Sequence, residues 1–372
     1  MRALLVRPPE PGVTLAEVPT PKMGETEVRV EMVEAGVCGT DRDIVAGEYG
    51  SPPLGRKDLV LGHENLGTVR EVGSRVEGLH RGDWVVATVR RGCGECRFCK
   101  AGRSDYCESG RFTERGIRGR DGYFAAQYVE APEYLVVVPK GLRHVAVLLE
   151  PLSVVEKAIL VGEQVLSRTG RLPPVEPQPM LRALVTGTGA VGMLAAFALR
   201  TRGYEVTTID RHDGTTPAAR MLVQIGAVHV NAEAGIAALG ERRFDLIVEA
   251  SGSLALDFDL MSVLGPNGAL VLTGIPRLGS TRVETASGAR VRSLVLENQA
   301  VVGSVNANRT HFERGLKDLG RFRRRFGDRV SGLITERVPL DRYADVFAER
   351  HSGAMKTVLT IGAGGDVASP TN

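Results

Sequence analysis

The sequence has no hydrophobic run long enough to cross a membrane. Its longest apolar stretch, residues 190–199, is far shorter than the roughly 20 residues of a transmembrane helix. Residues 1–9 contain no apolar stretch of signal-peptide length and lead directly into an alternating, strand-like pattern. We therefore expect a cytoplasmic protein with no membrane partner.

An excess of one charge is also absent. The chain carries 47 Lys and Arg against 44 Asp and Glu, a formal net charge of +3, spread along its whole length. This balance is too weak to indicate a nucleic-acid partner. One basic run, residues 321–325, is typical of a solvated helix face or a subunit contact, and a phosphate site is the alternative.

Cysteine is scarce, and four of the five cysteines lie close together in the sequence. The four are Cys93, Cys96, Cys99 and Cys107. In a reducing compartment such a cluster indicates metal ligands rather than disulfides. Four thiolates in one loop suit a tetrahedral zinc ion that is closed to substrate, so we predict a structural zinc lobe at about residues 90–110. An iron–sulfur cluster and free cysteines are the alternatives.

A chain of 372 residues exceeds what one core usually supports, so we expect two domains. Up to residue 139, short β-branched runs broken by Gly, Pro and Asp predict an irregular, barrel-like β domain. From residue 181, alternating strand and helix patterns predict a parallel, doubly wound sheet. After residue 303 the pattern resembles the first part again. We predict a discontinuous catalytic domain, 1–171 and 305–372, around a dinucleotide-binding Rossmann domain, 172–304.

A glycine-rich motif of the form GxGxxG marks the start of the predicted Rossmann domain. Its residues are Gly187, Thr188, Gly189, Ala190, Val191 and Gly192. The motif follows the predicted strand 183–186 and opens the predicted helix 191–200, which is the context that a dinucleotide fingerprint requires. The glycines permit a tight turn, a close approach of the pyrophosphate and packing of helix on strand, with the helix N-terminus facing the phosphates.

Two signals for the choice of cofactor conflict. Asp210 ends the second strand, where a carboxylate accepts hydrogen bonds from the ribose and repels a 2′-phosphate, which favours NAD. Arg211 and His212 follow at once, and an arginine there can hold a 2′-phosphate. We expect NAD to be preferred, with NADP as a second cofactor. Further cofactor-binding residues are expected to be Thr273, Ile275 and Asn306.

Three further segments indicate a function only when they are considered together. Cys38 lies in Gly-Val-Cys-Gly-Thr-Asp, His63 and Glu64 lie in Leu-Gly-His-Glu, and Glu150 precedes a proline. Alone, a cysteine is usually a core residue, and a His-Glu pair usually lies on the surface. With the four-cysteine loop and the GxGxxG motif, they resemble the zinc-containing medium-chain alcohol and polyol dehydrogenases over about residues 1–360. Glu150-Pro151-Leu152 resembles the sorbitol and sugar dehydrogenase branches, and segments 113–117 and 305–308 resemble the archaeal-type glucose 1-dehydrogenases.

The resemblance implies a set of functional residues and a GroES-like fold for the β-rich domain. Cys38, His63 and Glu150 would bind a catalytic zinc, with Glu64 as an exchangeable ligand. The implied substrate-binding residues are Thr40, His63, Glu64, Glu114, Glu150 and Asn306. The resemblance also implies a homotetramer, with a dimer as the alternative. The chain departs from the family at Val154, where an acid often contacts the sugar, and at Asp210, where NADP-preferring members carry a small neutral residue.

This ligand set predicts the chemistry. Three protein ligands leave zinc an open position for a substrate hydroxyl, whose ionisation the cation favours. Thr40 is expected to begin the proton relay and Glu64 to carry the proton. The first hypothesis is NAD(P)-linked oxidation of a sugar hydroxyl, such as D-glucose at C1 to the lactone. The alternatives are a dehydrogenase of another polyol, an amino alcohol or a modified sugar, and a non-catalytic binding or structural relative.

Overall fold

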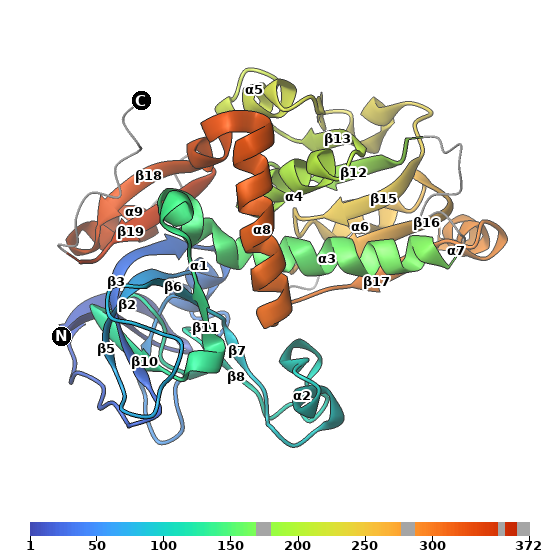
Figure 1. Ribbon diagram of the computed structural model, residues 1–372. Coiled ribbons are helices and arrows are strands. Elements are labelled where there is room, and N and C mark those ends of the chain that lie inside the picture. Colours follow the sequence, from blue (N-terminus) through green and yellow to red (C-terminus); the bar gives the residue numbers. More distant parts are fainter. Residues whose placement is uncertain (169–179, 277–286, 349–353, 363–372) are drawn as a thin grey trace. The chain divides into compact units, whose positions relative to one another are not determined.

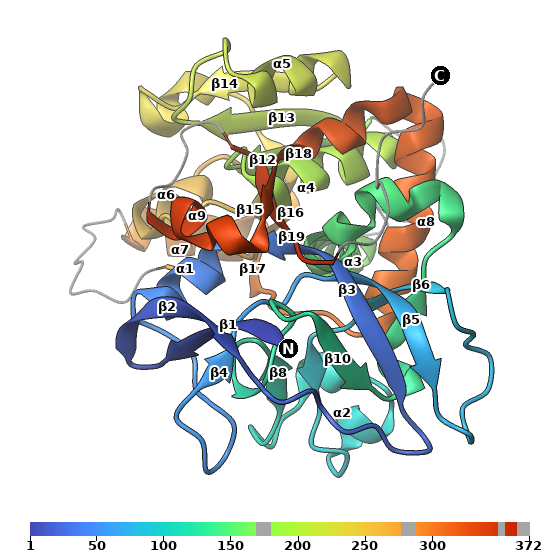
Figure 2. The same cartoon turned by 90° about the vertical axis from the view of Figure 1, so that its left-hand side faces the viewer.

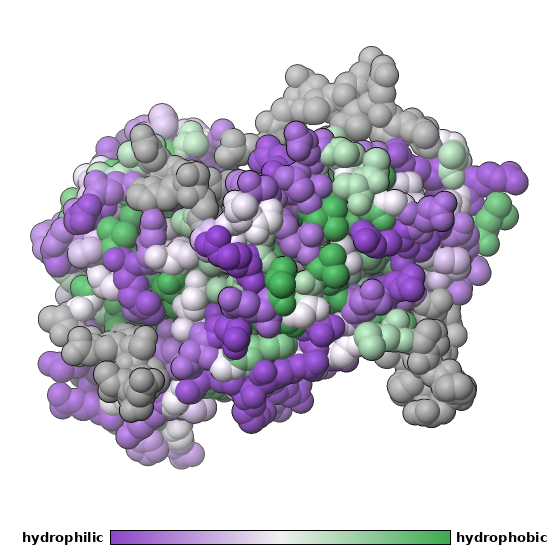
Figure 3. All heavy atoms as spheres, turned by 90° about the horizontal axis from the view of Figure 1, so that it is seen from above, coloured by the Kyte–Doolittle hydropathy of each residue, from purple (hydrophilic) through white to green (hydrophobic). Residues whose placement is uncertain are grey.

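The chain forms two compact units in the computed structural model, which describes residues 1–168, 180–276, 287–348 and 354–362. Unit 1 comprises Met1–Ser153, Asn306–Gly320 and Val330–Asn372, and unit 2 comprises Val154–Val305 and Arg321–Arg329. The predicted domain boundary at residue 171 lies outside the described residues. No helix of the described segments is long and apolar enough to cross a membrane. On the face drawn in Figure 3, hydrophilic residues predominate and hydrophobic ones are scattered among them.

Unit 1 is built around a seven-stranded sheet in the order β11-β6-β5-β3-β19-β18, with β10 also paired to β3. Its strands are β3 (Val28–Val37), β5 (Leu66–Val72), β6 (Trp84–Ala87), β10 (Gln127–Glu130), β11 (Leu135–Val137), β18 (Ile334–Pro339) and β19 (Lys356–Thr360). β19 pairs antiparallel with β3, so strands from the two ends of the chain share one sheet. This confirms the predicted discontinuous β-rich domain.

Two smaller sheets complete unit 1, and Figure 2 labels the strands of the first, β1 (Arg2–Arg7), β2 (Glu10–Glu17) and β4 (Leu59–Val60). The second contains β7 (Arg90–Arg91), β8 (Thr113–Arg115) and β9 (Gly119–Arg120). Short helices connect the strands: α1 (Gly39–Val45), α2 (Arg97–Lys100), α9 (Tyr343–Ala348) and the 3-10 helices η1 (Ser104–Tyr106), η2 (Pro132–Tyr134), η3 (Lys140–Leu148) and η6 (Leu340–Arg342). β3 passes from alternating to continuous burial along its length, which places its carboxyl end inside the unit.

Unit 2 contains a six-stranded sheet whose neighbouring strands are all parallel (Figure 1). The strands are β12 (Arg182–Thr186), β13 (Glu205–Asp210), β14 (Val228–Asn231), β15 (Phe244–Glu249), β16 (Leu264–Leu272) and β17 (Ala300–Gly303). Their order, β14-β13-β12-β15-β16-β17, is that of the doubly wound dinucleotide-binding fold. The predicted Rossmann fold is therefore confirmed.

Helices alternate with these strands. They are α4 (Ala190–Thr201), α5 (Pro217–Gln224), α6 (Leu254–Leu260) and α7 (Ser287–Leu296), with the 3-10 helix η4 (Gly235–Leu239). Two longer helices are α3 (Leu149–Ser167) and α8 (Arg309–Phe326), and the 3-10 helix η5 (Gly327–Leu333) follows α8. The sequence does not predict α7, because its apolar residues Val291, Val295 and Leu296 are exposed and form no stripe toward a core.

Candidate functional site

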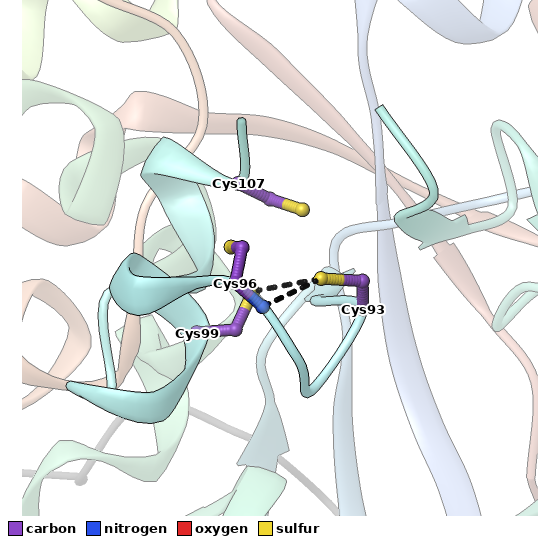
Figure 4. Close-up of side chains that lie close together, drawn as sticks. All are labelled: Cys93, Cys96, Cys99 and Cys107. Atoms are coloured by element: carbon purple, nitrogen blue, oxygen red, sulfur yellow. Dashed lines mark hydrogen bonds between the residues drawn. The ribbon is translucent and has the colours of Figure 1, made fainter. Parts of the chain in front are cut away.

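The four clustered cysteines meet in one lobe of unit 1 (Figure 4). Cys96 is the N-cap of α2 and Cys99 lies within that helix, while Cys93 and Cys107 flank it along the chain. Their four sulfur atoms lie within 4.8 Å of one another. The sulfurs of Cys93 and Cys99 are 3.9 Å apart, close to the edge of about 3.8 Å expected for a tetrahedron with Zn–S bonds of about 2.3 Å. The lobe fits a tetrahedral, thiolate-bound ion.

Hydrogen bonds also favour a thiolate in this lobe. Bonds from Ser109 and from the backbone N–H groups of Cys96 and Glu95 lower the pKa of Cys93 to about 6. Burial, together with hydrogen bonding to Cys96, raises the pKa of Cys99 to about 12. Four thiols this close cannot all ionise unless a cation offsets their charge, so a full thiolate set requires a bound metal.

Cys38, His63 and Glu64 form a second cluster in unit 1, with ligand atoms within 4.8 Å of one another. Cys38 follows β3 as the N-cap of α1, and His63 and Glu64 follow β4. Gly36 allows the two segments to approach, because a Cβ there would lie 1.9 Å from Glu64 Oε2. Thiolate, imidazole and carboxylate are the ligand types that zinc uses, so this donor set also fits the metal.

Two buried charged residues surround this cluster. His63 Nδ1 lies 3.2 Å from Asp41 Oδ1, and Asp41 Oδ2 accepts a hydrogen bond from the Cys38 N–H at 2.8 Å. A carboxylate beside Nδ1 leaves Nε2 as the metal-binding nitrogen. Lys356 Nζ donates to both carboxylate oxygens of Glu64, at 2.6 and 2.7 Å.

The electrostatics of the cluster favour a cation. Burial opposes charge on His63, but Asp41 and Cys38 outweigh it and raise the pKa of this imidazole well above its ordinary value. Burial raises the pKa of Glu150 to about 7, with His63 opposing the shift and Glu64 adding to it. Buried acids without full compensation are costly, so a bound cation relieves the excess of negative charge.

The remaining residues implied for this site lie close to it in the fold. Glu150 is in the first turn of α3 and is buried, but the group of mutually close ligand atoms contains Glu64 and not Glu150. Thr40 lies in the first turn of α1, two residues after Cys38, and is half-buried. The cluster therefore offers Glu64 as one carboxylate ligand, while Glu150, which interacts electrostatically with His63 and Glu64, lies outside the group of mutually close ligand atoms.

Glu114, on β8, is buried although arginines flank it in the sequence. Its side chain is 7% exposed. Its Oε1 accepts hydrogen bonds from Arg90 Nε at 3.1 Å, Arg90 Nη2 at 2.9 Å and Asn306 Nδ2 at 2.5 Å. Glu114 and Asn306 are thus brought together from positions 192 residues apart.

The glycine-rich motif of unit 2 has the geometry of a phosphate-binding turn. Gly187, directly after β12, has a φ of 82°, and Gly189 is the N-cap of α4. A Cβ on Gly192 would lie 1.9 Å from the Gly187 carbonyl oxygen, whereas a Cβ on Gly189 would meet nothing within 4 Å. The turn is thus closely packed at Gly192, where helix and strand meet, and open at Gly189, where the helix begins. A pyrophosphate bound at the helix N-terminus requires such an open position. Thr188, Ala190 and Val191 complete the motif.

Asp210, at the end of β13, is tied to this motif. Its Oδ2 accepts hydrogen bonds from Thr188 N at 2.7 Å and Thr188 Oγ1 at 3.0 Å, and its Oδ1 accepts one from His212 N at 3.0 Å. Burial opposes ionisation, but the bonds from His212 and Thr188 outweigh it and lower the pKa of Asp210. Arg211 and His212 are exposed. An ionised carboxylate therefore stands beside the glycine-rich turn.

A buried glutamate that the sequence does not mark organises the rest of this edge. Glu249, at the end of β15, is fully buried. Its Oε1 accepts hydrogen bonds from the Ser251 N–H at 2.6 Å and the Gly252 N–H at 2.9 Å, and its backbone oxygen accepts one from Thr273 Oγ1 at 2.5 Å. Ile275 is 65% exposed beyond Thr273. Glu249 therefore fixes the loop on which the predicted Thr273 and Ile275 stand.

Four residues of the candidate sites are not predicted from the sequence: Asp41, Arg90, Glu249 and Lys356. Asp41 had a usable signal, since it ends the Cys-Gly-Thr-Asp segment. Lys356 had none, because the contact that defines it is with a residue 292 positions away.

Comparison with protein families matches almost the whole chain. Residues 143–361 match the family described as glucose dehydrogenase C-terminus, and residues 24–140 match the alcohol dehydrogenase GroES-like domain. The two matches cover the strands and helices that carry both metal-binding clusters and the glycine-rich turn.

Several similar proteins are named glucose dehydrogenases. The chain is 40% identical to a glucose 1-dehydrogenase of Methanocella arvoryzae, over 98% of this chain and 100% of the relative. It is 39% identical to a glucose 1-dehydrogenase of Thermoproteus tenax, over 97% and 99%. It also resembles the solved structure of Haloferax mediterranei glucose dehydrogenase in complex with NADP, zinc and gluconolactone, with a TM-score of 0.86, 30% identity and coverage of 98% and 100%. The chain belongs to the glucose dehydrogenase family of the zinc-dependent medium-chain dehydrogenases.

Proposed function

We propose that this enzyme oxidises an aldose at its anomeric carbon, with D-glucose as substrate, the lactone as product and a nicotinamide dinucleotide as hydride acceptor. The observation that carries the proposal is the meeting of Cys38, His63 and Glu64 in one cluster, in which His63 and Glu64 are buried. The buried Glu114 and the half-buried Asn306 supply the polar partners that a sugar needs. The Haloferax mediterranei relative, named for complexes with NADP, zinc and gluconolactone, supports the substrate class.

Two zinc ions per chain follow from the two donor sets. Cys93, Cys96, Cys99 and Cys107 would hold the structural ion. Cys38 and His63 would hold the catalytic ion with Glu150 or Glu64 as the carboxylate ligand. When bound, the catalytic ion supplies Lewis acidity, which lowers the pKa of a hydroxyl group at its open position.

The side chains around the cluster orient the substrate and move its proton. Thr40 accepts the proton of the reacting hydroxyl and passes it on, with Glu64 as the carrier. Lys356 donates hydrogen bonds to both oxygens of Glu64, which holds that carboxylate in place. Glu114 Oε2 accepts no hydrogen bond within the described part of the chain, so it is available to a sugar hydroxyl.

Unit 1 is the catalytic domain in this proposal, and unit 2 binds the dinucleotide through residues 187–192. Asp210 makes NAD the preferred cofactor, because a 2′-phosphate would meet an ionised carboxylate. Arg211 and His212 allow NADP as a second cofactor.

We also propose that the enzyme is a homotetramer, or a dimer, in the cytoplasm. β17 is an edge strand of the six-stranded sheet, and Val291, Val295 and Leu296 of unit 2 are exposed. An edge strand with exposed apolar neighbours is suited to pairing with a second copy. None of the five cysteines forms a disulfide, as is expected in a reducing compartment.

A substrate panel tests the activity. The purified enzyme, loaded with zinc, is given NAD⁺ and a series of aldoses, polyols and amino alcohols, and NADH formation is followed by absorbance. Aldoses should be oxidised and their lactones recovered. Turnover of sorbitol or threonine with none of any aldose would overturn the proposal.

A further inference from the structure

Arg90 lies at the centre of a polar network in unit 1 that also contains Glu114 and Asn306. It belongs to β7, and its side chain is 8% exposed. Its Nε and Nη2 donate to Glu114 Oε1, and its Nη1 donates to the Asp105 carbonyl oxygen at 3.1 Å. The ring of Phe112 lies 4.0 Å from the guanidinium carbon. Each of the three guanidinium nitrogens therefore has a fixed partner.

Asp105 connects Arg90 to the four-cysteine lobe. It lies in η1, between Cys99 and Cys107, and is 4% exposed. Its Oδ1 accepts a hydrogen bond from Asn308 Nδ2 at 2.8 Å. Asn308 and Asp105 are 203 residues apart in sequence, so the lobe is fastened to the loop that also carries Asn306.

These contacts close a ring. Arg90 joins Glu114 to Asp105, Asn308 joins Asp105 to the 306–308 loop, and Asn306 returns to Glu114. Glu114 is held by Arg90 and by Asn306, so its side chain loses less conformational entropy when a ligand binds. A side chain fixed in this way can make a selective polar contact.

The ring leaves one side of Glu114 free. All three of its donors bind Oε1, and none binds Oε2 in the segments that the structure describes. Arg90 thus balances the charge of this buried carboxylate and orients it without using its second oxygen. A lysine at position 90 is a single point charge, which cannot grip Glu114 with two nitrogens and the Asp105 carbonyl with a third.

We propose that Arg90 is a positioning residue that sets the selectivity of the enzyme among sugars. It holds Glu114 so that Oε2 accepts one particular hydroxyl of the substrate, and it ties this acceptor to the four-cysteine lobe. The proposal rests on the proposed function of Glu114 as a sugar-hydroxyl partner. A sugar that lacks the matching hydroxyl leaves a buried oxygen unpaired, and is rejected for that reason.

The test compares Arg90→Met and Arg90→Lys with the unaltered zinc-loaded enzyme, using glucose and its 2-, 3- and 4-deoxy analogues. Arg90→Met should raise the KM for glucose about tenfold or more, because a charge-assisted contact is lost, while the KM for NAD⁺ stays unchanged. The unaltered enzyme should discriminate against at least one deoxy analogue, and Arg90→Met should lose that discrimination. Arg90→Lys should restore only part of it. Arg111→Met is the matched control, since Arg111 follows the same lobe but forms an exposed ion pair with Glu95.

A double variant separates positioning from folding. In a Glu114→Gln background, Arg90→Met should add little further change in the KM for glucose, because Arg90 acts through Glu114. If Arg90→Met fails to fold, the KM for glucose and the discrimination against deoxy sugars are measured in Arg90→Lys and Asn308→Ala instead. The inference is overturned if the KM for glucose and the deoxy-sugar discrimination stay at the unaltered values in variants that fold. An unaltered enzyme without activity on any aldose would overturn the proposed function, and this inference with it.

Discussion

Glu249→Gln tests how the dinucleotide-binding edge of unit 2 is held together. The Glu249 carboxylate is fully buried and accepts hydrogen bonds from the Ser251 N–H, the Gly252 N–H and, at 3.2 Å, the Gly274 N–H. These groups belong to the loops after β15 and β16. An amide in its place removes the charge and turns an N–H₂ group toward donors, so at least one of these bonds is lost.

The expected magnitude follows from the type of bond. A hydrogen bond to a charged group contributes about 1.5–3 kcal/mol, so Glu249→Gln should cost about 2 kcal/mol. In a domain of this size that corresponds to a decrease of about 4–8 °C in the Tm of unit 2. The affinity for NADH should also fall about tenfold, because the Gly274 N–H is bound to the Glu249 carboxylate and Gly274 lies in the loop that carries Thr273 and Ile275.

Calorimetry and titration with NADH measure the two effects. Glu205→Gln is the matched control, because Glu205 lies on β13 in an exposed, loose ion pair with Arg182 at 3.7 Å, and such pairs contribute about 0–1 kcal/mol. If Glu249→Gln and Glu205→Gln give the same Tm and the same NADH affinity, the reasoning about Glu249 is wrong.

Three further predictions concern the metal site, the cofactor and pH. Cys38→Ala should abolish turnover and lower the zinc content by about one ion per chain, while the affinity for NADH, measured by titration, stays unchanged; retained turnover would contradict the metal site. Asp210→Gly should shift the ratio of kcat/KM values toward NADP⁺, because a carboxylate no longer repels the 2′-phosphate, and an unchanged ratio would remove the argument for NAD. Burial opposes ionisation of Glu130, but Arg115 and Arg91 outweigh it and lower its pKa to about 2. The folded-state pKa is thus depressed, so its stabilisation is complete above about pH 4.5 and is lost as the pH falls toward 2. Glu130→Gln should therefore be less stable at pH 7 and lose less stability on acidification, as urea unfolding at several pH values would show; an unchanged acid profile would contradict this.

The parts of the fold predicted from sequence are those whose signals are local. The glycine-rich turn is recognisable because strand, turn and helix follow one another within residues 183–200. The four-cysteine lobe is recognisable because its ligands lie within fifteen positions, 93–107. Alternating strands and helices give the doubly wound sheet in the same way. In each case the physics that shapes the segment acts between near neighbours.

The catalytic cluster could be predicted only in part. Cys38 and the adjacent pair His63 and Glu64 come from two separate segments, and family resemblance rather than spacing indicated that they belong together. Lys356 could not be predicted, because a lysine becomes buried only where a distant carboxylate receives it, and nothing near it in the sequence indicates that partner.

Arg90 and α7 illustrate two other limits. In the sequence Arg90 is one of many charged residues. Its proposed role depends on its simultaneous contacts with Glu114 and Asp105, which only the fold brings together. Helix α7 keeps its apolar residues exposed, so the periodicity that marks a core-facing helix is missing.

Anomalous diffraction at the zinc edge, from crystals of the zinc-loaded enzyme, is the most direct test of the central claim. The account predicts two peaks per chain, one among the four cysteines of the lobe and one between Cys38 and His63 with a carboxylate of Glu64 or Glu150 beside it. A peak in the lobe with none at Cys38 and His63, in crystals of enzyme that is active, would contradict the assignment of the catalytic centre.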